Sequence, residues 1–292
     1  MNICIFCHEK TDTSKSVEHI IPESLGNKHH YLPKGYVCDK CNNYFSIKIE
    51  KELLSQPYFI SLRFRNEIKT KKGKLVKEKM IFPEIVTSAD VTLQTTHVGV
   101  MVSFDDDTLY NSIKNGKTKR MIGLHYPEPN YPNRIMSRFL AKCAYEYFLY
   151  NVGKDNYDLC VRELLGGGSD ILKSLRQYAR FGKGEYWQYS QRRIYSEGDI
   201  VFDSNDGIFY ERLHEMQLFI KEHNIMPNGL VSAEIYFVMA ISGIEYAICI
   251  SDQNISGYKN WIEDHNGASP LTSNNERLHL SLSNVNPMLI KK

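Results

Sequence analysis

The sequence lacks the features of membrane and secreted proteins. No apolar run approaches the roughly 18 residues that a membrane-spanning helix needs. The first residues, MNICIFCHEK, have neither the basic start nor the apolar stretch of a secretory signal. There is no internal repeat and no low-complexity tail. These absences predict a cytoplasmic globular protein with no membrane partner.

The chain also carries little net charge, only +2 over 292 residues, but the charge is unevenly spread. Residues 1–80 hold 15 Lys and Arg against 9 Asp and Glu, a net charge of +6. Residues 81–292 hold 21 against 25, a net charge of −4. A basic end on a nearly neutral chain indicates a polyanionic partner such as a nucleic acid.

The seven cysteines argue against a disulfide framework, because their number is odd and there is no secretion signal. Four of them form two C-x-x-C pairs, which are Cys4, Cys7, Cys38 and Cys41. Such pairs predict a closed Zn²⁺ site of four thiolates, which would stabilise a unit too small to hold a secure core. Two alternatives are buried cysteines without a metal and a redox pair. The other three cysteines, at positions 143, 160 and 249, are predicted to be core residues.

Residues 16–26, SVEHIIPESLG, lie between the two cysteine pairs, and the second pair is followed by Asn-Asn at the start of a helix. This combination, over roughly residues 1–56, resembles the HNH endonuclease family and its members that carry a zinc ribbon. The resemblance implies a ββα-metal finger, in which two strands and a helix hold one catalytic divalent cation.

The resemblance also implies a role for each matching residue. Glu18 would bind the catalytic cation, which would be Mg²⁺ or Mn²⁺, and Asn42 would complete its site. His19 would be the general base that activates water. Hydrolysis in this family would leave 5′-phosphate and 3′-hydroxyl ends.

The chemistry of phosphodiester cleavage favours the same residue types. A hard divalent cation neutralises the phosphate and stabilises the departing oxygen, and it prefers carboxylate and amide oxygens. A neutral imidazole can take a proton from water at cellular pH. One geometric difficulty is that neighbours on a regular strand, such as Glu18 and His19, point to opposite faces. In the alternative interpretation these two residues form a surface pair on a structural zinc ribbon, and Asn42 is only a helix N-cap.

Residues 63–79 contain eight Lys and Arg against two Glu. This segment is a predicted nucleic-acid contact, since lysines bind the phosphate backbone without reading sequence. The candidate binding residues are Lys69, Lys71, Lys72, Lys74 and Lys77. The alternative is a solvated surface hairpin.

Residues 178–193 interleave aromatic and basic side chains, which indicates either a base-stacking surface or core with a polar rim.

The periodicity predicts an α+β protein with three consecutive parts. Residues 1–56 would be the zinc-bound ββα-metal module, residues 57–104 a basic region of strands, and residues 105–292 a mixed α+β accessory domain of unresolved topology. The elements expected are a helix from Asn42 or Asn43 to residue 54, a hairpin turn at 71–74, a strand pair within 85–104, a loop at 105–132, helices at 133–151 and 171–180, and strands from 193 to 251.

Together these features predict a metal-dependent HNH endonuclease that hydrolyses phosphodiester bonds. DNA is the favoured substrate, with RNA as the second candidate. The accessory domain would recognise substrate, dimerise or regulate, and a homo-oligomer is compatible with the sequence. Such nucleases commonly carry additional domains, and this suggests a role in bacterial or phage-related defence. The alternative function is a non-catalytic zinc-ribbon protein that binds nucleic acid.

Overall fold

The structure is a computed structural model that describes residues 3–27, 29–153, 170–196, 200–203, 208–211, 214–225, 231–273 and 279–280. The chain divides into two compact units. The first contains Met1–Ile21, His29–Ile49 and Pro132–Lys292, and the second contains Pro22–Lys28 and Glu50–Tyr131. Both combine helices with antiparallel strands, so the α+β class predicted from the sequence is confirmed.

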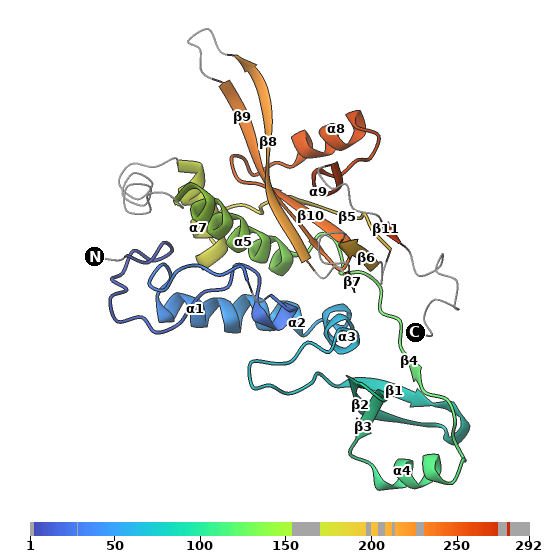
Figure 1. Ribbon diagram of the computed structural model, residues 1–292. Helices are drawn as coiled ribbons and strands as arrows, with labels where there is room; N and C mark the ends of the chain where they lie inside the picture. The colour runs from blue at the N-terminus through green and yellow to red at the C-terminus, as the bar shows by residue number, and fades with distance from the viewer. Residues whose placement is uncertain are drawn as a thin grey trace. The chain divides into compact units, whose positions relative to one another are not determined.

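The first unit is built on a four-stranded antiparallel sheet in the order β5-β10-β9-β8 (Figure 1). Its strands are β5 (Tyr189–Arg193), β8 (His214–Ile225), β9 (Val231–Ile241) and β10 (Ile244–Cys249). Strands β9 and β10 are joined by a tight turn in which Gly243 has φ +80°. A Cβ at Gly243 would lie 2.5 Å from the Tyr195 carbonyl oxygen, so a side chain does not fit there.

Helices cover both faces of this sheet, which explains why every residue of β10 is buried, although its side chains alternate between the faces. On one face, α5 (Arg134–Gly153) contacts β9, β10 and α7 (Asp170–Phe181), and Tyr147 of α5 packs on Phe237. On the other face lie α8 (Ser256–Asp264) and α9 (Pro270–Ser273). The core there is formed by Tyr236, Val238, Ala240, Ala247, Cys249, Ile255, Tyr258 and Leu271.

The first unit also holds helix α1 (Asp39–Phe45) and a small sheet in the order β11-β6-β7. The strands of this sheet are β6 (Ile200–Asp203), β7 (Ile208–Glu211) and β11 (His279–Leu280). A π-helical stretch, Ser46–Glu50, follows α1 without a break.

The second unit combines short helices with a four-stranded antiparallel sheet in the order β3-β2-β1-β4. The strands are β1 (Glu78–Phe82), β2 (Thr87–Thr96), β3 (Gly99–Phe104) and β4 (Ile122–Gly123). The helices are η1 (Glu23–Leu25), α2 (Lys51–Leu54), α3 (Pro57–Arg65), η3 (Pro83–Ile85) and α4 (Asp107–Lys114). Its sheet core consists of Phe64, Met80, Phe82, Val91 and Leu109.

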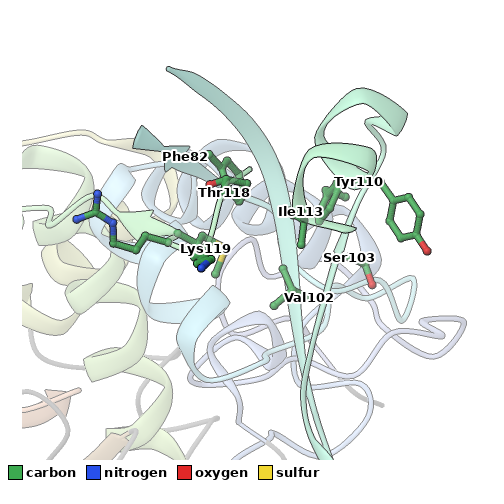
Figure 2. Close-up of a pocket in the computed structure, with 10 residues that line it drawn as sticks. Phe82, Val102, Ser103, Tyr110, Ile113, Thr118 and Lys119 are labelled. Atoms are coloured by element: carbon green, nitrogen blue, oxygen red, sulfur yellow. The ribbon is translucent and has the colours of Figure 1, made fainter. Parts of the chain in front are cut away.

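A pocket of about 520 Å³ lies between β3, α4 and residues 118–121 of this unit (Figure 2). Its lining is mostly apolar, with Phe82, Val102 and Ile113 among the residues labelled in the figure. Thr118 at its edge donates to Glu84, and Arg120 pairs with the same carboxylate at 2.7 Å.

Three predicted elements differ from the structure. The first helix begins at Asp39, with Cys38 rather than Asn42 or Asn43 as its N-cap, because the Cys38 sulfur accepts from the Cys41 amide. Residues 57–65 form helix α3 instead of a strand, since Pro57 occupies its first turn. The predicted loop at 105–132 contains helix α4, which Asp106 caps.

Most of the other predicted elements are confirmed by the structure. The strand pair within 85–104, the helices at 133–151 and 171–180, and the strand pair about Gly243 all form. The turn at 71–74 forms, but the hairpin expected around it does not, because residues 67–69 and 75–77 form no strands and β1 begins only at Glu78. Three of the aromatic side chains of 178–193 belong to the core, since Tyr178, Trp187 and Tyr189 are buried, whereas Phe181 is exposed.

The compact units group the chain differently from the three consecutive parts predicted. Residues 1–21 and 29–49 pack with residues 132–292, because α5 and α7 supply the partners that such a short segment lacks. No helix in the described part of the chain is long and apolar enough to cross a bilayer.

We expect Asp106→Ala to destabilise the protein by about 1 kcal/mol, because the substitution removes the side-chain bond to the Leu109 amide that caps α4. Urea unfolding of the full chain measures this change. The matched control is Asp107→Ala, which removes a carboxylate from the same helix turn but not the cap. Equal losses of stability for both variants would contradict the capping role.

Candidate metal centre and nuclease site

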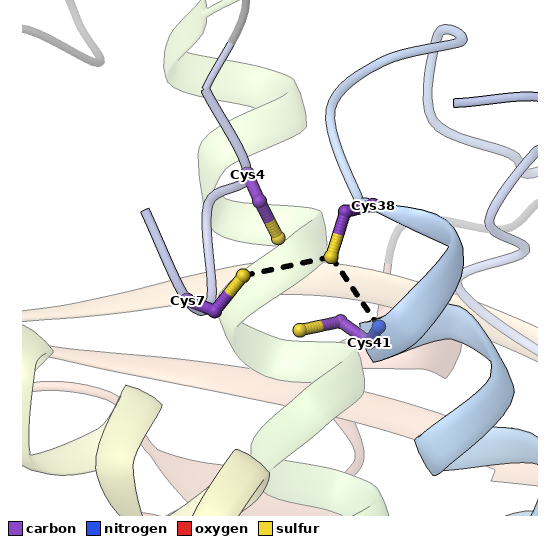
Figure 3. Close-up of side chains that lie close together, drawn as sticks. All are labelled: Cys4, Cys7, Cys38 and Cys41. Atoms are coloured by element: carbon purple, nitrogen blue, oxygen red, sulfur yellow. Dashed lines mark hydrogen bonds between the residues drawn. The ribbon is translucent and has the colours of Figure 1, made fainter. Parts of the chain in front are cut away.

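The four cysteines predicted to bind zinc converge on one point in the first unit (Figure 3). All four sulfur atoms lie within 4.8 Å of one another, and the Cys7 and Cys38 sulfurs are 3.5 Å apart. In a tetrahedral site with Zn–S bonds of about 2.3 Å, neighbouring sulfurs are about 3.8 Å apart. The sulfurs therefore fit a zinc ion with little adjustment.

Local backbone geometry explains why the sulfurs converge. The first pair sits on a tight loop, where the His8 amide donates to the Cys4 carbonyl and the Cys4 amide donates to the Glu9 carbonyl. Closing this loop places His8 in the left-handed region, at φ +63°. The second pair begins α1, where the Cys41 amide lies 3.4 Å from the Cys38 sulfur.

The close approach and burial of the four thiols change the pKa values of three of them. The hydrogen bond from Cys41 lowers the pKa of Cys4 to about 4, whereas burial raises the pKa of Cys7 to about 11. The same contact with Cys4 raises the pKa of the Cys41 thiol. Four thiolates this close need a cation to offset their mutual repulsion, and a divalent ion with four sulfur ligands supplies it.

Arg180 at the end of α7 reaches this cluster and is almost fully buried. Its Nε donates to the Cys41 sulfur at 3.2 Å, and its guanidinium stacks on the Tyr44 ring at 3.7 Å. A positive group bonded to a ligand sulfur offsets part of the negative charge of a zinc tetrathiolate.

Where two strands were expected beside the cysteines, the structure has one isolated antiparallel bridge with flanking hydrogen bonds, which we call the strand pair. His19 and Tyr31 form an isolated bridge, the Ile20 amide donates to the His30 carbonyl, and the Leu32 amide donates to the Glu18 carbonyl. The His19 imidazole is half-exposed and packs against the Tyr31 ring, with centroids 6.1 Å apart.

Helix α1 lies against this strand pair through two polar contacts. The Asp39 carboxylate accepts from the backbone and hydroxyl of Ser16, at 2.8 and 2.6 Å. The Asn42 Nδ2 donates to the Val17 carbonyl at 3.0 Å. His19 and Asn42 are therefore brought to neighbouring elements, as a ββα arrangement requires.

Glu18, the predicted cation ligand, is buried and holds an ammonium group. Its Oε1 lies 2.6 Å from the Nζ of Lys142, and the Glu18 side chain is only 4% exposed. Among the described residues, the four cysteines are the only group of three or more His, Cys, Asp or Glu placed to hold a metal. In this arrangement the Glu18 carboxylate is paired with a positive charge, and the Asn42 amide nitrogen donates to the Val17 carbonyl.

The comparison with known families agrees with this geometry. Residues 4–57 match an HNH endonuclease family. The HNH segment, as we call these residues from here on, is less than a fifth of the 292-residue chain. No curated protein and no solved structure matches the chain.

Sequence reasoning missed the side chains of α5 and α7 that support the HNH segment. Lys142 and Glu146 of α5 are fully buried, and Lys142 contacts both Glu18 and Glu146. A Lys and a Glu spaced i, i+4 on a mostly apolar helix were the available signal, because buried charges are rare unless they are paired. No sequence pattern pointed to Arg180.

The predicted nucleic-acid-binding lysines lie in the second unit and are exposed. They flank a turn in which the Thr70 amide donates to the Lys74 carbonyl and Gly73 has φ +74°. Lys77 pairs with Asp105 at 2.8 Å, and this contact raises the pKa of Lys77. The other four candidates are Lys69, Lys71, Lys72 and Lys74.

Of the three cysteines predicted to be core residues, Cys143 and Cys249 are fully buried. Position 160 lies outside the described residues.

We expect Arg180→Gln to weaken zinc retention about 10- to 100-fold, because the variant loses the charged donor to the Cys41 sulfur. Zinc release to a chromogenic chelator, followed at increasing chelator concentration, measures this change. Lys183→Gln, which removes an exposed charge just beyond α7, is the control and should retain zinc as the parent protein does. Unchanged retention in Arg180→Gln would contradict the proposed contact with the zinc site.

Proposed function

We propose that the protein is an HNH-type endonuclease that hydrolyses phosphodiester bonds, with DNA as the favoured substrate. The observation that carries the proposal is the position of His19. It lies on a strand paired with residues 30–32 and beside α1, within the segment that matches the HNH endonuclease family. RNA is the second candidate substrate.

His19 is the proposed general base. Its half-exposed imidazole can take a proton from a water molecule, and the hydroxide formed attacks phosphorus. The bond from phosphorus to the 3′ oxygen breaks, and that oxygen takes a proton from solvent. The ends produced are a 5′-phosphate and a 3′-hydroxyl, as the family resemblance implies.

Zinc bound by Cys4, Cys7, Cys38 and Cys41 has a structural role in this proposal, since four sulfur ligands leave no open position for chemistry. A requirement for Mg²⁺ or Mn²⁺ is proposed from the family alone. Asn42 remains the candidate ligand on α1, while the contact between Glu18 and Lys142 argues against the carboxylate.

The exposed lysines of the second unit are proposed to bind the phosphate backbone. Lysines placed around a turn can neutralise several phosphates without reading base sequence. The predictions of a cytoplasmic location, a homo-oligomer and a role in bacterial or phage-related defence remain predictions.

The alternative is a non-catalytic zinc-ribbon protein that binds nucleic acid. The ion pair between Glu18 and Lys142 favours this alternative, because a purely structural ribbon has no need of an open cation site. The two functions differ in whether a bound nucleic acid is cut.

We expect the zinc-loaded protein to nick supercoiled plasmid when Mg²⁺ or Mn²⁺ is added. His19→Ala should lower the nicking rate about 10²- to 10⁴-fold, because the general base is removed. Gel mobility of the plasmid measures nicking, and zinc content with thermal melting checks that the variant folds. The control His125→Ala removes an exposed imidazole from the second unit and should nick as the parent does. A shift in plasmid mobility without strand breaks, in either metal, would establish the binding alternative instead.

We expect Lys71, Lys72 and Lys74, changed together to Gln, to weaken nucleic-acid binding mainly at low salt. The slope of log affinity against log salt should fall by about 2 to 3, close to 0.9 for each phosphate that is no longer neutralised. Fluorescence anisotropy of a labelled duplex, titrated at several salt concentrations, measures the slope. A control with the same change of charge is Lys114, Lys117 and Lys119 to Gln. Equal slopes in the two triple variants would contradict a specific role for the turn.

A further inference from the structure

Lys142 is an ammonium group enclosed by the first unit, with none of its side chain exposed. A buried charge is tolerated only when it is paired and hydrogen-bonded. Its Nζ lies 2.6 Å from Glu18 Oε1 and 3.3 Å from Glu146 Oε2, and it donates to the His19 carbonyl at 2.8 Å. The ring of Phe45, on α1, is 5.7 Å away.

The contacts of Lys142 connect the parts of the predicted nuclease site. Glu18 and His19 belong to the short strand, Phe45 belongs to α1, and Glu146 lies one turn along α5. The next residue on α5 continues the pattern, because Cys143 donates through its sulfur to the Ile20 carbonyl at 3.0 Å. Two consecutive residues of α5 thus hold two consecutive carbonyls of the strand that bears His19.

These contacts of α5 matter because few backbone hydrogen bonds hold the strand that bears His19. The pairing with residues 30–32 amounts to one isolated bridge and its flanking hydrogen bonds. With Glu18 buried and His19 half-exposed, a shift of this strand by one residue in register would exchange the side chain that faces solvent. A displacement of about 1 Å of a catalytic group costs on the order of 10²-fold in rate.

We propose that Lys142 is a positioning residue of the nuclease site, and that Glu18 is its counter-ion rather than a ligand of the catalytic cation. The inference rests on the proposed function, since it assigns the group that holds the general base in place. It also assigns a role to α5, within residues 132–153. Its Lys142 supports the HNH segment although it lies more than 120 residues from His19 along the chain.

The test uses the full-length, zinc-loaded protein. Lys142→Met alone leaves a buried carboxylate without its ammonium, so the decisive variant is the charge-balanced Glu18→Gln with Lys142→Met. Glu18→Gln and Lys142→Arg complete the set, and Lys173→Met, an exposed lysine on α7, is the control. Zinc content and a cooperative thermal transition establish folding. The readouts are kcat, KM and the half-saturating Mn²⁺ concentration for plasmid nicking.

We expect the folded double variant to lose about 10- to 100-fold in kcat, with KM for plasmid nearly unchanged. Lys142→Arg, which keeps a positive donor, should recover part of kcat. The half-saturating Mn²⁺ concentration should stay the same in Glu18→Gln, because the carboxylate does not bind the cation. A kcat equal to that of the Lys173→Met control in the folded double variant would overturn the positioning role. A tenfold or greater rise in half-saturating Mn²⁺ for Glu18→Gln would make Glu18 a ligand instead.

A second measurement separates this inference from the proposed function. If the parent protein does not cut nucleic acid, the endonuclease proposal fails, but the contact between Lys142 and the His19 strand can still be measured. Hydrogen exchange at the Ile20 amide, which bonds the His30 carbonyl, should be about tenfold faster in the double variant and unchanged in Lys173→Met. Unchanged exchange at Ile20 would show that Lys142 does not hold this strand.

Discussion

Four sulfur atoms within 4.8 Å of one another bring the loop of Cys4 and Cys7 to the start of α1, and the contacts of Asp39 with Ser16 and of Asn42 with Val17 add to this junction. Cys7 and Cys38 lie 31 positions apart, and between them the backbone forms a single isolated bridge and a few hydrogen bonds. A segment of this size buries too little apolar surface to be stable alone. Metal binding would therefore be part of its folding free energy, and the position of His19 depends on it.

Besides the metal site, α5 and α7 support the HNH segment, because side chains of these helices donate hydrogen bonds to its backbone. Backbone carbonyls of the segment accept from side chains of these helices, and such bonds matter because a buried carbonyl without a donor is costly. The donor and acceptor pairs are Lys142 with His19, Cys143 with Ile20, Tyr145 with Ile5 and Arg176 with Phe6. The part of the segment that belongs to the first unit is thus packed on α5 and α7.

The ion pair of Glu18 changes how an acidic residue beside His19, the proposed general base, is understood. A carboxylate next to a histidine suggests a cation ligand when only the sequence is known. Here the same carboxylate is buried against an ammonium from a helix far along the chain. Removing one member of such a pair would be costly, while its net contribution to stability is small, so a role in holding the strand explains the pair better than stability does.

Sequence alone predicted the cysteine cluster, because metal-ligand spacing is a local property of the chain. The short motif pointed to His19 for the same reason, and its catalytic role stays a prediction. Sequence also predicted α5, α7 and the strand pair about Gly243 from their periodicity, and it missed α4, whose short helix is started by the Asp106 cap within a polar stretch. The partner of Glu18 and the donor to Cys41 could not be predicted, since Lys142 and Arg180 reach them across more than 120 residues of chain. Contacts at that separation arise from the packing of α5 and α7, and only the tertiary structure decided them.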